Sequence, residues 1–450
     1  MNIIHYILGI PPLRGGGLVK YAMDLATAQS QMGHDVCILY PGSIKKDDNV
    51  QRIRSKKKEG NVIYFEIINP LPVSMASGMC DTKRFMEKAD KKVYEKFFEK
   101  KDTQVLHIHS LMGLHLELVE AAKKLNVKVV FTSHDYFGVC PKSNFMYQNR
   151  ICQDVFWDNC EQCCNAPDSY KVIIRRQSHW FELYTKCKLL VWIVKKMKNI
   201  LKREQNNTKH FVDSLHIELN SYNNYQELKK YYEKIFSLVD CMHYNSSLAK
   251  QMYERVLGEK KNVVLQVLHR EIVDKRKKRI CTNTVRFGFL GNGETYKGFE
   301  MLKEIFDVLW ELKKNKFILN VYFDWKGREE YIQAHSRYEY NEIDRVFEAM
   351  DILLVPSLWA ETYGFVVLEA IMHGVPVIVS ENVGAKDFLL KIGDIGKVVK
   401  ADKESWSRVL LGVIENPTEI AEMSKKICNA DIVVDYKEYS NKIIRLYQGL

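Results

Sequence analysis

A strand, a loop, a helix and a second strand follow one another within residues 351–379. Ile352–Val355 is a short apolar run closed by proline, which is typical of a buried parallel strand. Phe365–His373 has the apolar spacing of a helix and is followed by glycine, and Val375–Val379 is rich in β-branched residues. This order predicts a βαβ unit, in which ligands bind beyond the carboxyl ends of the strands. The chain is therefore expected to have an α/β fold with parallel sheets.

Two glutamates occupy the part of this unit where a ligand would lie. Glu361 is in the loop after the first strand, and Glu369 follows eight positions later in the helix. Gly364 and Phe365 begin that helix, whose free backbone N–H groups favour an anion. Because carboxylates repel a phosphate, we expect them to bind hydroxyl groups, one on a sugar and the other on a ribose. The alternative is a pair of solvated glutamates on an amphipathic helix.

The same stretch resembles family 4 of the retaining glycosyltransferases, which have the two-lobed GT-B fold. The resemblance rests on Glu361-x7-Glu369 between a Pro-Ser pair and a Gly-x-Pro-Val-Ile segment. It implies two Rossmann-like lobes with parallel sheets that face a central cleft. It also implies a UDP- or GDP-sugar donor, with Glu361 at the donor sugar and Glu369 at the ribose. Gly364, Phe365 and Gly384 are expected to bind the donor through nearby backbone N–H groups.

A glycine-rich turn near the N-terminus is the second candidate donor site. Gly16 and Gly17 lie between an apolar strand and a helical stretch at Leu18–Met32. The glycines do not form a Gly-x-Gly-x-x-Gly dinucleotide motif, and no acidic residue ends the following strand. Taken alone, the turn is equally consistent with a tight turn and a ligand loop, and the family resemblance favours donor binding.

The C-terminal half contains a candidate phosphate clamp. Lys297 lies in a glycine-flanked loop at a helix start, where its ammonium and backbone N–H groups can converge on a diphosphate. The loop resembles the family's Gly-Arg…Lys-Gly clamp, but Asn292 occupies the position of the arginine. The sequence leaves open whether Arg286, Arg14 or another cation replaces it. The sequence has no Asp-x-Asp at a strand end, so we expect no catalytic metal.

Histidines follow two predicted strands of the N-terminal half. His134 and Asp135 come directly after Val127–Thr132, and His109 ends an earlier strand. The His-Asp pair matches a motif that the family uses near the donor sugar, so we assign His134 a catalytic role and Asp135 and His109 an acceptor-side role. A structural histidine is the alternative in both places.

Cysteines gather in residues 140–164. Cys140, Cys152, Cys160 and Cys163 provide four thiolates, enough for a tetrahedral structural zinc site, although their spacing is not that of a standard zinc finger. Free thiols and disulfides are the alternatives. Eleven cysteines without a signal peptide predict a reducing, cytoplasmic location.

The net charge of +11 favours an anionic partner. A nucleotide diphosphate or an anionic lipid fits this charge, whereas no nucleic-acid-reading motif is present. Residues 171–221 are basic and aromatic, and the apolar run Leu189–Val194 is too short to span a bilayer. We therefore expect peripheral contact with the inner face of the plasma membrane, with a core helix carrying a solvated basic face as the alternative.

The expected domains are an N-terminal acceptor-side lobe (1–270), a charged linker (271–284) and a C-terminal nucleotide-sugar-binding lobe (285–430). A terminal helix within 431–450 is expected to pack back on the first lobe. The lysine-rich residues 45–60 are expected to form an exposed loop.

These features together predict a retaining glycosyltransferase of the hexosyltransferase type. It would transfer a sugar from a nucleotide-sugar to a hydroxyl of a lipid-linked or oligosaccharide acceptor, in synthesis of a bacterial capsule, exopolysaccharide or O-antigen. A sugar-nucleotide epimerase or a retaining phosphorylase of the same fold is one alternative. A second alternative is a scaffold protein that lost its activity when the arginine of the clamp was lost.

Overall fold

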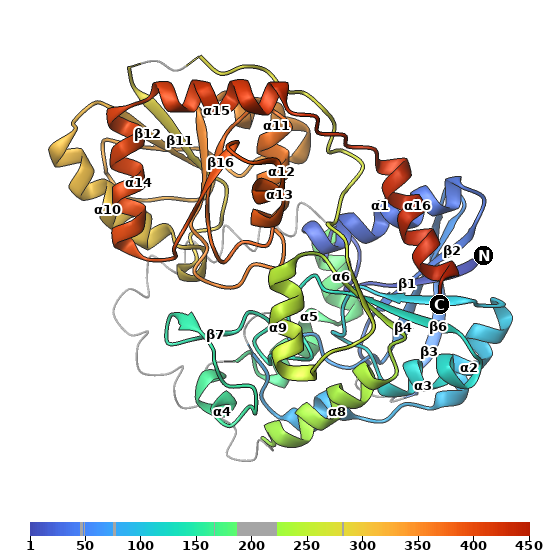
Figure 1. Cartoon of the computed structure of the whole chain (residues 1–450). Coiled ribbons are helices and arrows are strands. Elements are labelled where there is room, and N and C mark those ends of the chain that lie inside the picture. Colours follow the sequence, from blue (N-terminus) through green and yellow to red (C-terminus); the bar gives the residue numbers. More distant parts are fainter. Residues whose placement is uncertain (46–47, 49, 75–77, 166, 187–222, 281–282) are drawn as a thin grey trace.

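The protein is described by a computed structural model that covers residues 1–45, 48, 50–74, 78–165, 167–186, 223–280 and 283–450. Two α/β lobes lie one above the other in Figure 1. Each lobe has its own sheet, and the chain crosses between the sheets after residue 264 and returns at its end. The expected fold of two lobes with parallel sheets is thus present.

The N-terminal lobe contains an eight-stranded sheet in the order β10-β9-β6-β5-β1-β2-β4-β3. All neighbouring strands are parallel except β3 and β4. The strands are β1 (Asn2–Tyr6), β2 (Asp35–Pro41), β3 (Arg52–Glu59), β4 (Val62–Ile68), β5 (Val105–Ile108), β6 (Lys128–Thr132), β9 (Cys241–Tyr244) and β10 (Asn262–Val264).

The prediction of an exposed loop at residues 45–60 is wrong for residues 52–59, which form strand β3. Residues 52–59 pair with β4 in antiparallel orientation and form the edge of the sheet. Most of its side chains are exposed, so the strand has no apolar alternation to reveal it. Its lysines and arginines are the charges that protect a sheet edge from pairing with another chain.

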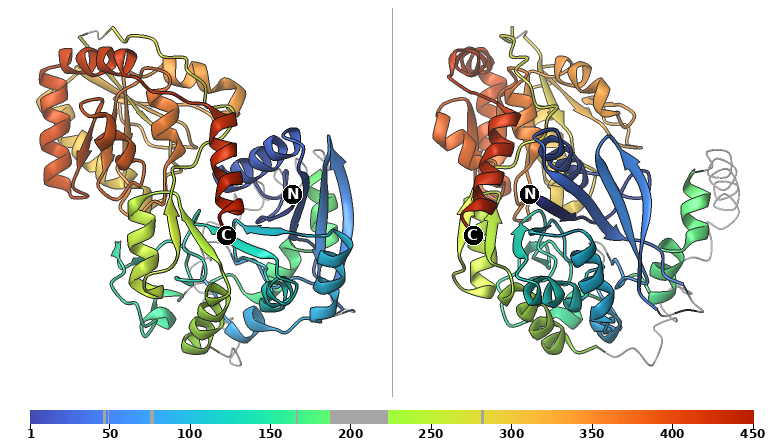
Figure 2. Two further views of the ribbon diagram at one scale, coloured as in Figure 1. Left: turned by 45° about the vertical axis from the view of Figure 1, so that its right-hand side comes forward. Right: turned by 90° about the vertical axis from the view of Figure 1, so that its right-hand side faces the viewer.

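Helices cover both faces of the first sheet. On one face α1 packs beside the C-terminal helix α16, and on the other α2, α3 and α8 pack against each other (Figures 1 and 2). Short elements between β6 and α8 carry the cysteines and the basic stretch. The elements of this lobe are α1 (Gly17–Gln31), η2 (Thr82–Met86), α2 (Lys91–Lys100), α3 (Leu116–Lys124), the hairpin β7 (Met146–Tyr147) and β8 (Arg150–Ile151), α4 (Cys160–Cys163), α5 (Tyr170–Arg176), α6 (His179–Lys186), α8 (Tyr225–Ser237), α9 (Ser247–Leu257) and α16 (Tyr436–Gln448).

The C-terminal lobe contains a six-stranded parallel sheet in the order β13-β12-β11-β14-β15-β16. Its strands are β11 (Val285–Phe289), β12 (Phe317–Val321), β13 (Ile332–Ala334), β14 (Ile352–Val355), β15 (Val377–Ser380) and β16 (Gly396–Val399). Its helices are η3 (Thr295–Lys297), α10 (Phe299–Leu312), η4 (Tyr340–Glu342), α11 (Ile343–Glu348), α12 (Phe365–Ile371), α13 (Lys386–Ile392), α14 (Lys403–Glu415) and α15 (Thr418–Asn429).

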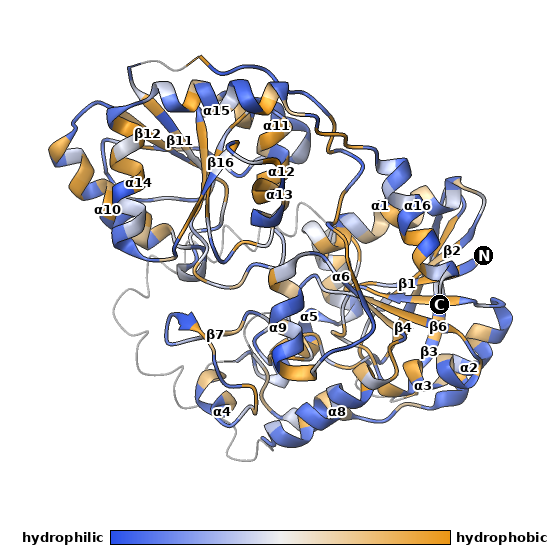
Figure 3. Cartoon of the chain, in the orientation of Figure 1, coloured by the Kyte–Doolittle hydropathy of each residue, from blue (hydrophilic) through white to orange (hydrophobic). Residues whose placement is uncertain are grey.

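The apolar core continues from one lobe into the other. Residues of α1 and α16 belong to the same buried cluster as residues of α11, α12 and α13, whereas α10 and α14 enclose a separate core on the far face of the second sheet. Figure 3 shows apolar strands inside both lobes and polar outer faces on the helices. The lobes are therefore packed together along their α1 and α12 faces.

Helix α16 ends the chain on the N-terminal lobe, where Figure 2 shows it alongside α1. The hydroxyl groups of Tyr21 and Tyr439 are 2.7 Å apart and both side chains are buried. The chain thus closes on its own first lobe.

Among the described residues, no helix has the length and apolar character needed to cross a bilayer.

Candidate active site

A cleft of about 760 Å³ lies between the lobes, at the carboxyl ends of strands β11 and β14 and against the N-terminus of α1. This is where ligands bind in parallel α/β sheets. Nine of the predicted site residues line it: Gly16, Gly17, His134, Asn292, Lys297, Glu361, Gly364, Phe365 and Glu369.

Lys297 and Glu361 form an ion pair within the cleft. The Lys297 Nζ is 2.8 Å from Oε1 of Glu361, and the Ser357 hydroxyl donates to Oε2 at 2.5 Å. Burial alone would raise the pKa of Glu361, but the charge of Lys297 and these hydrogen bonds outweigh it and hold the pKa below its usual value. Glu361 is therefore ionised at neutral pH, and both oxygens have a partner.

Glycine allows the two loops that carry this pair to approach closely. Gly298 has φ 80°, and a Cβ there would lie 2.1 Å from the carbonyl oxygen of Pro356. The Lys297 loop is thereby held against the loop that follows β14, on which Glu361 lies.

Glu369 forms a second polar group in the cleft. It is buried on α12, and His269 Nε2 lies 3.0 Å from its Oε1. The His269 ring also contacts Tyr340 and Phe365, with centroids 5.4 and 5.1 Å away. The Glu369 side chain is thus fixed by His269 and also by a hydrogen bond to the Tyr340 side chain.

The N-termini of α1 and α12 face each other across the cleft. Gly16 precedes α1 with φ 94°, and Gly364 precedes α12 with φ 96°. A Cβ on Gly17 would lie 3.0 Å from the Phe365 ring, so the lobes meet here at near contact distance. The first backbone N–H groups of a helix have no partner within the helix, so both ends favour an anion.

Hydrogen bonds join the lobes beside the glutamate loop. The Thr362 hydroxyl donates to the His134 carbonyl at 2.9 Å, and the Ser246 hydroxyl donates to the Thr362 carbonyl at 2.6 Å. The Ser247 hydroxyl is 2.6 Å from Asp387 Oδ1. These contacts position the loop of Glu361 against strand ends of the N-terminal lobe.

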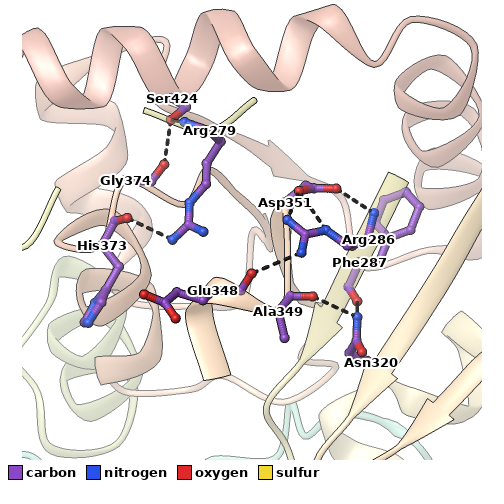
Figure 4. A network of polar contacts seen from close by, with 10 residues as sticks. All are labelled: Arg279, Arg286, Phe287, Asn320, Glu348, Ala349, Asp351, His373, Gly374 and Ser424. Carbon is purple, nitrogen blue, oxygen red and sulfur yellow. Dashed lines mark hydrogen bonds and ion pairs between the residues drawn. The ribbon is translucent and has the colours of Figure 1, made fainter. Parts of the chain in front are cut away.

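The missing clamp arginine is not replaced by Arg286. Figure 4 shows the Arg286 guanidinium bound to Asp351, 2.6 Å away, and to the Glu348 carbonyl. Arg286 lies near the beginning of β11, away from the carboxyl edge. Arg14 lines a different pocket. The lysines of the cleft are Lys297 and Lys20, which is paired with Glu271 at 2.5 Å.

Figure 4 also shows how the interlobe linker joins the C-terminal lobe. The Arg279 guanidinium donates to the His373 carbonyl at 3.0 Å, and the backbone N–H of Arg279 donates to the Ser424 hydroxyl at 2.8 Å. The basic linker is therefore bound to the lobe surface by hydrogen bonds.

A chain of buried hydrogen bonds begins at a backbone carbonyl in the N-terminal lobe. Because the Leu265 carbonyl can only accept, His243 Nε2 donates to it (2.7 Å) and His243 Nδ1 accepts from Thr132 (2.9 Å). The Thr132 oxygen then accepts from His107 Nε2 (2.6 Å), and His107 Nδ1 accepts from the Tyr447 hydroxyl on α16 (2.6 Å). The direction of each bond is assigned from its neighbour, for neutral imidazoles.

The same chain continues to the cleft. Since the Tyr447 proton is already donated, its oxygen accepts from Gln29 Nε2 (3.3 Å), and Gln29 Oε1 accepts from His5 Nε2 (2.8 Å). His5 Nδ1 accepts from His109 Nε2 (2.9 Å), and His109 Nδ1 accepts from His134 Nε2 (3.3 Å). His134 is thereby assigned a proton on Nε2.

Burial keeps the imidazoles of this chain neutral. It lowers the pKa of His5 and of His243 to about 4 and that of His134 to about 3, and it holds the pKa of His107 and His109 well below the usual value. His134 lines the cleft, and its Nδ1 has no partner among the described residues. That nitrogen therefore offers a lone pair to a hydroxyl donor.

Three predicted residues do not line the cleft. His109 is buried in the hydrogen-bond chain, and the Asp135 carboxylate accepts from the Phe137 backbone N–H at 2.8 Å. The Gly384 N–H donates to the Glu361 carbonyl at 2.9 Å, and a Cβ on Gly384 would lie 2.1 Å from the Thr362 carbonyl. These positions do not support the expected direct ligand contacts: His109 instead contacts His134, and Gly384 packs against the glutamate loop.

The cysteines predicted to bind zinc line one small cavity. Cys140, Cys152, Cys160, Cys163 and the neighbouring Cys164 surround about 20 Å³ between the β7–β8 hairpin and α4, and all five are free thiols. Within the described residues, however, the one group whose ligand atoms all lie within 4.8 Å is His5, His107 and His109. The thiols as placed would have to rotate to share an ion.

The histidine group needs no metal to satisfy it. Both ring nitrogens of His5, His107 and His109 already have hydrogen-bond partners in the chain traced above.

Sequence reasoning missed several residues of the cleft. Lys20, His269, Tyr338 and Tyr340 line it, but they lie outside the family motifs that identified the other residues. His269 follows the last strand of the first sheet, and this position is the signal that would have drawn attention to it.

Comparisons with known proteins agree with the fold. Residues 271–430 match the family described as glycosyl transferases group 1, and residues 15–204 match glycosyltransferase family 4. A protein described as an uncharacterised 42.6 kDa protein in the cps region of Klebsiella pneumoniae is 23% identical over 464 aligned positions, covering 100% of both chains.

Solved structures share the fold at low identity. WaaG, a glycosyltransferase involved in lipopolysaccharide biosynthesis, is 12% identical with a TM-score of 0.58 over 100% of both chains. Sucrose-phosphate synthase from Thermosynechococcus elongatus is 11% identical with a TM-score of 0.56, covering 100% of this chain and 99% of its own. Anabaena HepE in complex with UDP and glucose is 11% identical with a TM-score of 0.57 over 100% of both chains.

The fold is that of the GT-B glycosyltransferases. With one glycosyltransferase family match on part of each lobe, the chain resembles the family 4 type of glycosyltransferases.

Proposed function

We propose that this protein transfers a sugar from a nucleotide-sugar to an acceptor hydroxyl, with retention of configuration. The arrangement of the two glutamates carries the proposal. Glu361, held by Lys297, and Glu369, held by His269, flank the N-terminus of α12 in one cleft. A diphosphate between them would meet N–H groups and an ammonium, and its sugar and ribose would each meet a carboxylate.

The chemistry requires stabilisation of charge. As the glycosidic bond breaks, the nucleotide diphosphate gains negative charge and the sugar becomes cationic. The Lys297 ammonium, which is paired with Glu361, would also bind the phosphate. The N-termini of α1 and α12 would add N–H donors. Glu361 and the Nδ1 of His134 would accept hydrogen bonds from sugar hydroxyls. The ribose would bind the carboxylate of Glu369.

We infer that the acceptor belongs to a bacterial surface polysaccharide. The relative from the cps region and the likeness to a lipopolysaccharide glycosyltransferase support this context. The complex of HepE with UDP and glucose supports a nucleotide-sugar donor. A lipid-linked acceptor would place the protein at an anionic membrane. Trp180 and Leu183 on α6 are 80% and 45% exposed beside basic residues, as an interfacial helix requires. Leu189–Val194 lies outside the described residues.

A thermal-shift panel tests donor binding. UDP, GDP, CDP and ADP are added without metal to wild type, to Glu369→Gln and to the exposed control Glu404→Gln. A nucleotide at 100 times its Kd stabilises the folded state by about 2.7 kcal/mol. We expect one nucleotide to raise the midpoint of wild type and of Glu404→Gln, and to do so much less for Glu369→Gln. No shift with any nucleotide would favour an inactive scaffold.

Transfer itself is tested with the sugar nucleotide that carries the base found in this way. NMR of the product shows whether the anomeric configuration is retained. A labelled sugar that changes its stereochemistry but never leaves the nucleotide would identify an epimerase instead.

A further inference from the structure

A second pocket of about 650 Å³ lies on the N-terminal lobe next to the cleft. It is formed by the ends of β1 and β2, residues of β3 and β4, and the α5–α6 segment. The loop between β1 and α1 separates the two spaces, because Arg14 lines this pocket while Gly16 and Gly17 line the cleft. A molecule in the second pocket would therefore adjoin the donor side of the cleft.

The pocket has an excess of positive charge. Arg14, Lys56, Lys57 and Arg176 line it together with one carboxylate, that of Glu66. Glu66 is 2% exposed and is already bound by Arg54 and by Lys56, whose Nζ is 3.5 Å away. The charge of Glu66 is thus shared by Arg54 and Lys56, and Lys57 is paired with Glu59 at 2.5 Å, so neither carboxylate balances Arg14.

Arg14 is the cation without a counterion. Its side chain packs over Gly9, where a Cβ would lie 2.5 Å from the Arg14 Cγ. Within the described part of the chain, no carboxylate lies within ion-pair distance of its guanidinium, whereas Arg176 is 2.5 Å from Asp168. Burial, and then the charge of Arg176, lower the pKa of Arg14. An anion would relieve this unfavourable environment.

Gln177 adds a second unused donor. Its side chain is buried in the pocket wall, and its Oε1 accepts from the Val73 backbone N–H at 2.8 Å. Its Nε2 has no acceptor among the described residues. A buried N–H without an acceptor costs free energy that a ligand oxygen would recover.

We propose that this pocket binds a phosphoryl group of the acceptor, with Arg14 as the residue that recognises it. The proposal rests on the glycosyltransferase function proposed above. Several cations around one uncompensated guanidinium suit a phosphate dianion better than a single carboxylate. The phosphate belongs either to a lipid carrier or to a water-soluble sugar phosphate. The exposed Trp180 and Leu183 of α6, the helix that contributes Phe181 to the pocket, favour the lipid carrier.

Binding of defined phosphate esters tests the proposal. Farnesyl phosphate in detergent micelles and glucose 1-phosphate are titrated into the full-length protein, with farnesol and glucose as uncharged controls. The variants are Arg14→Gln, Arg14→Lys, Lys297→Gln in the cleft, and Arg408→Gln, whose side chain is 76% exposed on α14. Circular dichroism verifies that each variant is folded.

We expect at least one ester to bind wild type, Lys297→Gln and Arg408→Gln alike. Arg14→Gln should bind it about 10- to 100-fold more weakly, since a hydrogen bond to a charged group is lost, and Arg14→Lys should bind with intermediate affinity. Binding of farnesyl phosphate alone indicates a lipid carrier, and binding of glucose 1-phosphate alone indicates a soluble acceptor. The proposal is overturned if neither ester binds, if Arg14→Gln binds like wild type, or if affinity depends on Lys297 instead.

The nucleotide thermal shift separates this proposal from the proposed function. Arg14→Gln should leave that shift unchanged. If the protein binds phosphate esters through Arg14 but binds no nucleotide, the pocket remains a phosphate site and the donor site is refuted. If the protein binds a nucleotide but no phosphate ester, only the phosphate pocket is refuted.

Discussion

Lys297 Nζ lies 2.8 Å from Glu361 Oε1, although the two residues come from different loops of the C-terminal lobe. Each side chain offsets the cost of burying the other's charge. A bound diphosphate could replace Glu361 as the partner of the Lys297 ammonium. In the proposed reaction, both charges would thus be in place before the donor binds.

Replacement of Lys297 by Met should lower kcat by at least about 100-fold, because an ammonium aimed at the leaving group is lost. It should also reduce stability by about 2 kcal/mol, since Glu361 is left without a counterion. Initial rates and urea unfolding measure these effects. The double variant Lys297→Met/Glu361→Gln should regain stability but not activity. A double variant as unstable as the single one would contradict a direct charge pairing.

The raised pKa of Asp135 makes the free energy of unfolding depend on pH. Burial raises this pKa to about 6. Asp135 therefore holds a proton in the folded state between the unfolded pKa of about 3.9 and pH 6, and its own contribution to stability falls as pH rises through this window. The buried histidines, whose pKa values are lowered, contribute with the opposite sign. Asp135→Asn should remove only the contribution of Asp135 and stabilise the protein by about 1 to 2 kcal/mol at pH 7, allowing for the partial exposure of the carboxylate. Urea unfolding at pH 4.5 and pH 7 measures it. Equal pH slopes for variant and wild type would refute the raised pKa.

Gly17→Ala should weaken nucleotide binding, because the added methyl group would lie 3.0 Å from the Phe365 ring and push the lobes apart. We expect about a tenfold higher Kd for the nucleotide that wild type binds. Gly15→Ala is the matched control, since nothing lies within 4 Å of a Cβ there. If both variants bind nucleotide equally well, the contact between the lobes does not control donor binding.

Tyr447→Phe removes the hydroxyl that donates to His107 and accepts from Gln29. It should cost about 1 to 2 kcal/mol of stability and loosen the orientation of His134, because buried partners are left without a hydrogen bond. Nitrogen-15 NMR of the histidines should show His134 protonated on Nε2 in wild type and a tautomer mixture in the variant. Tyr436→Phe on the same helix is the control, as its hydroxyl has no partner among the described residues. An unchanged His134 signal in Tyr447→Phe would disprove the coupling.

A structural zinc at Cys140, Cys152, Cys160 and Cys163 stays a prediction. We expect about one zinc per chain in protein purified without chelator, and its loss in Cys160→Ser, with a lower melting temperature in both the variant and chelated wild type. Protein without zinc whose stability is unaffected by chelator would leave free thiols as the correct interpretation. Cys241→Ser, in strand β9, is the comparison for loss of a thiol elsewhere.

The local sequence determined the βαβ unit that carries Glu361 and Glu369, because strand, glycine and helix signals there agree with each other. It also identified Lys297 and the Gly16–Gly17 turn through spacing that resembles the family. The edge strand β3 was not predicted from the sequence. An exposed edge strand has no apolar alternation, and its lysines are equally typical of a loop.

Tertiary structure decided which polar residues share a site. His269 meets Glu369 across 100 positions, and Tyr447 reaches His107 across 340, only because the linker and α16 return to the lobes. The same folding buries His109 and places Arg14 at a pocket where it has no counterion among the described residues. Propensity and motif spacing act over a few residues, whereas burial and charge pairing depend on distances that exist only after the two lobes have packed.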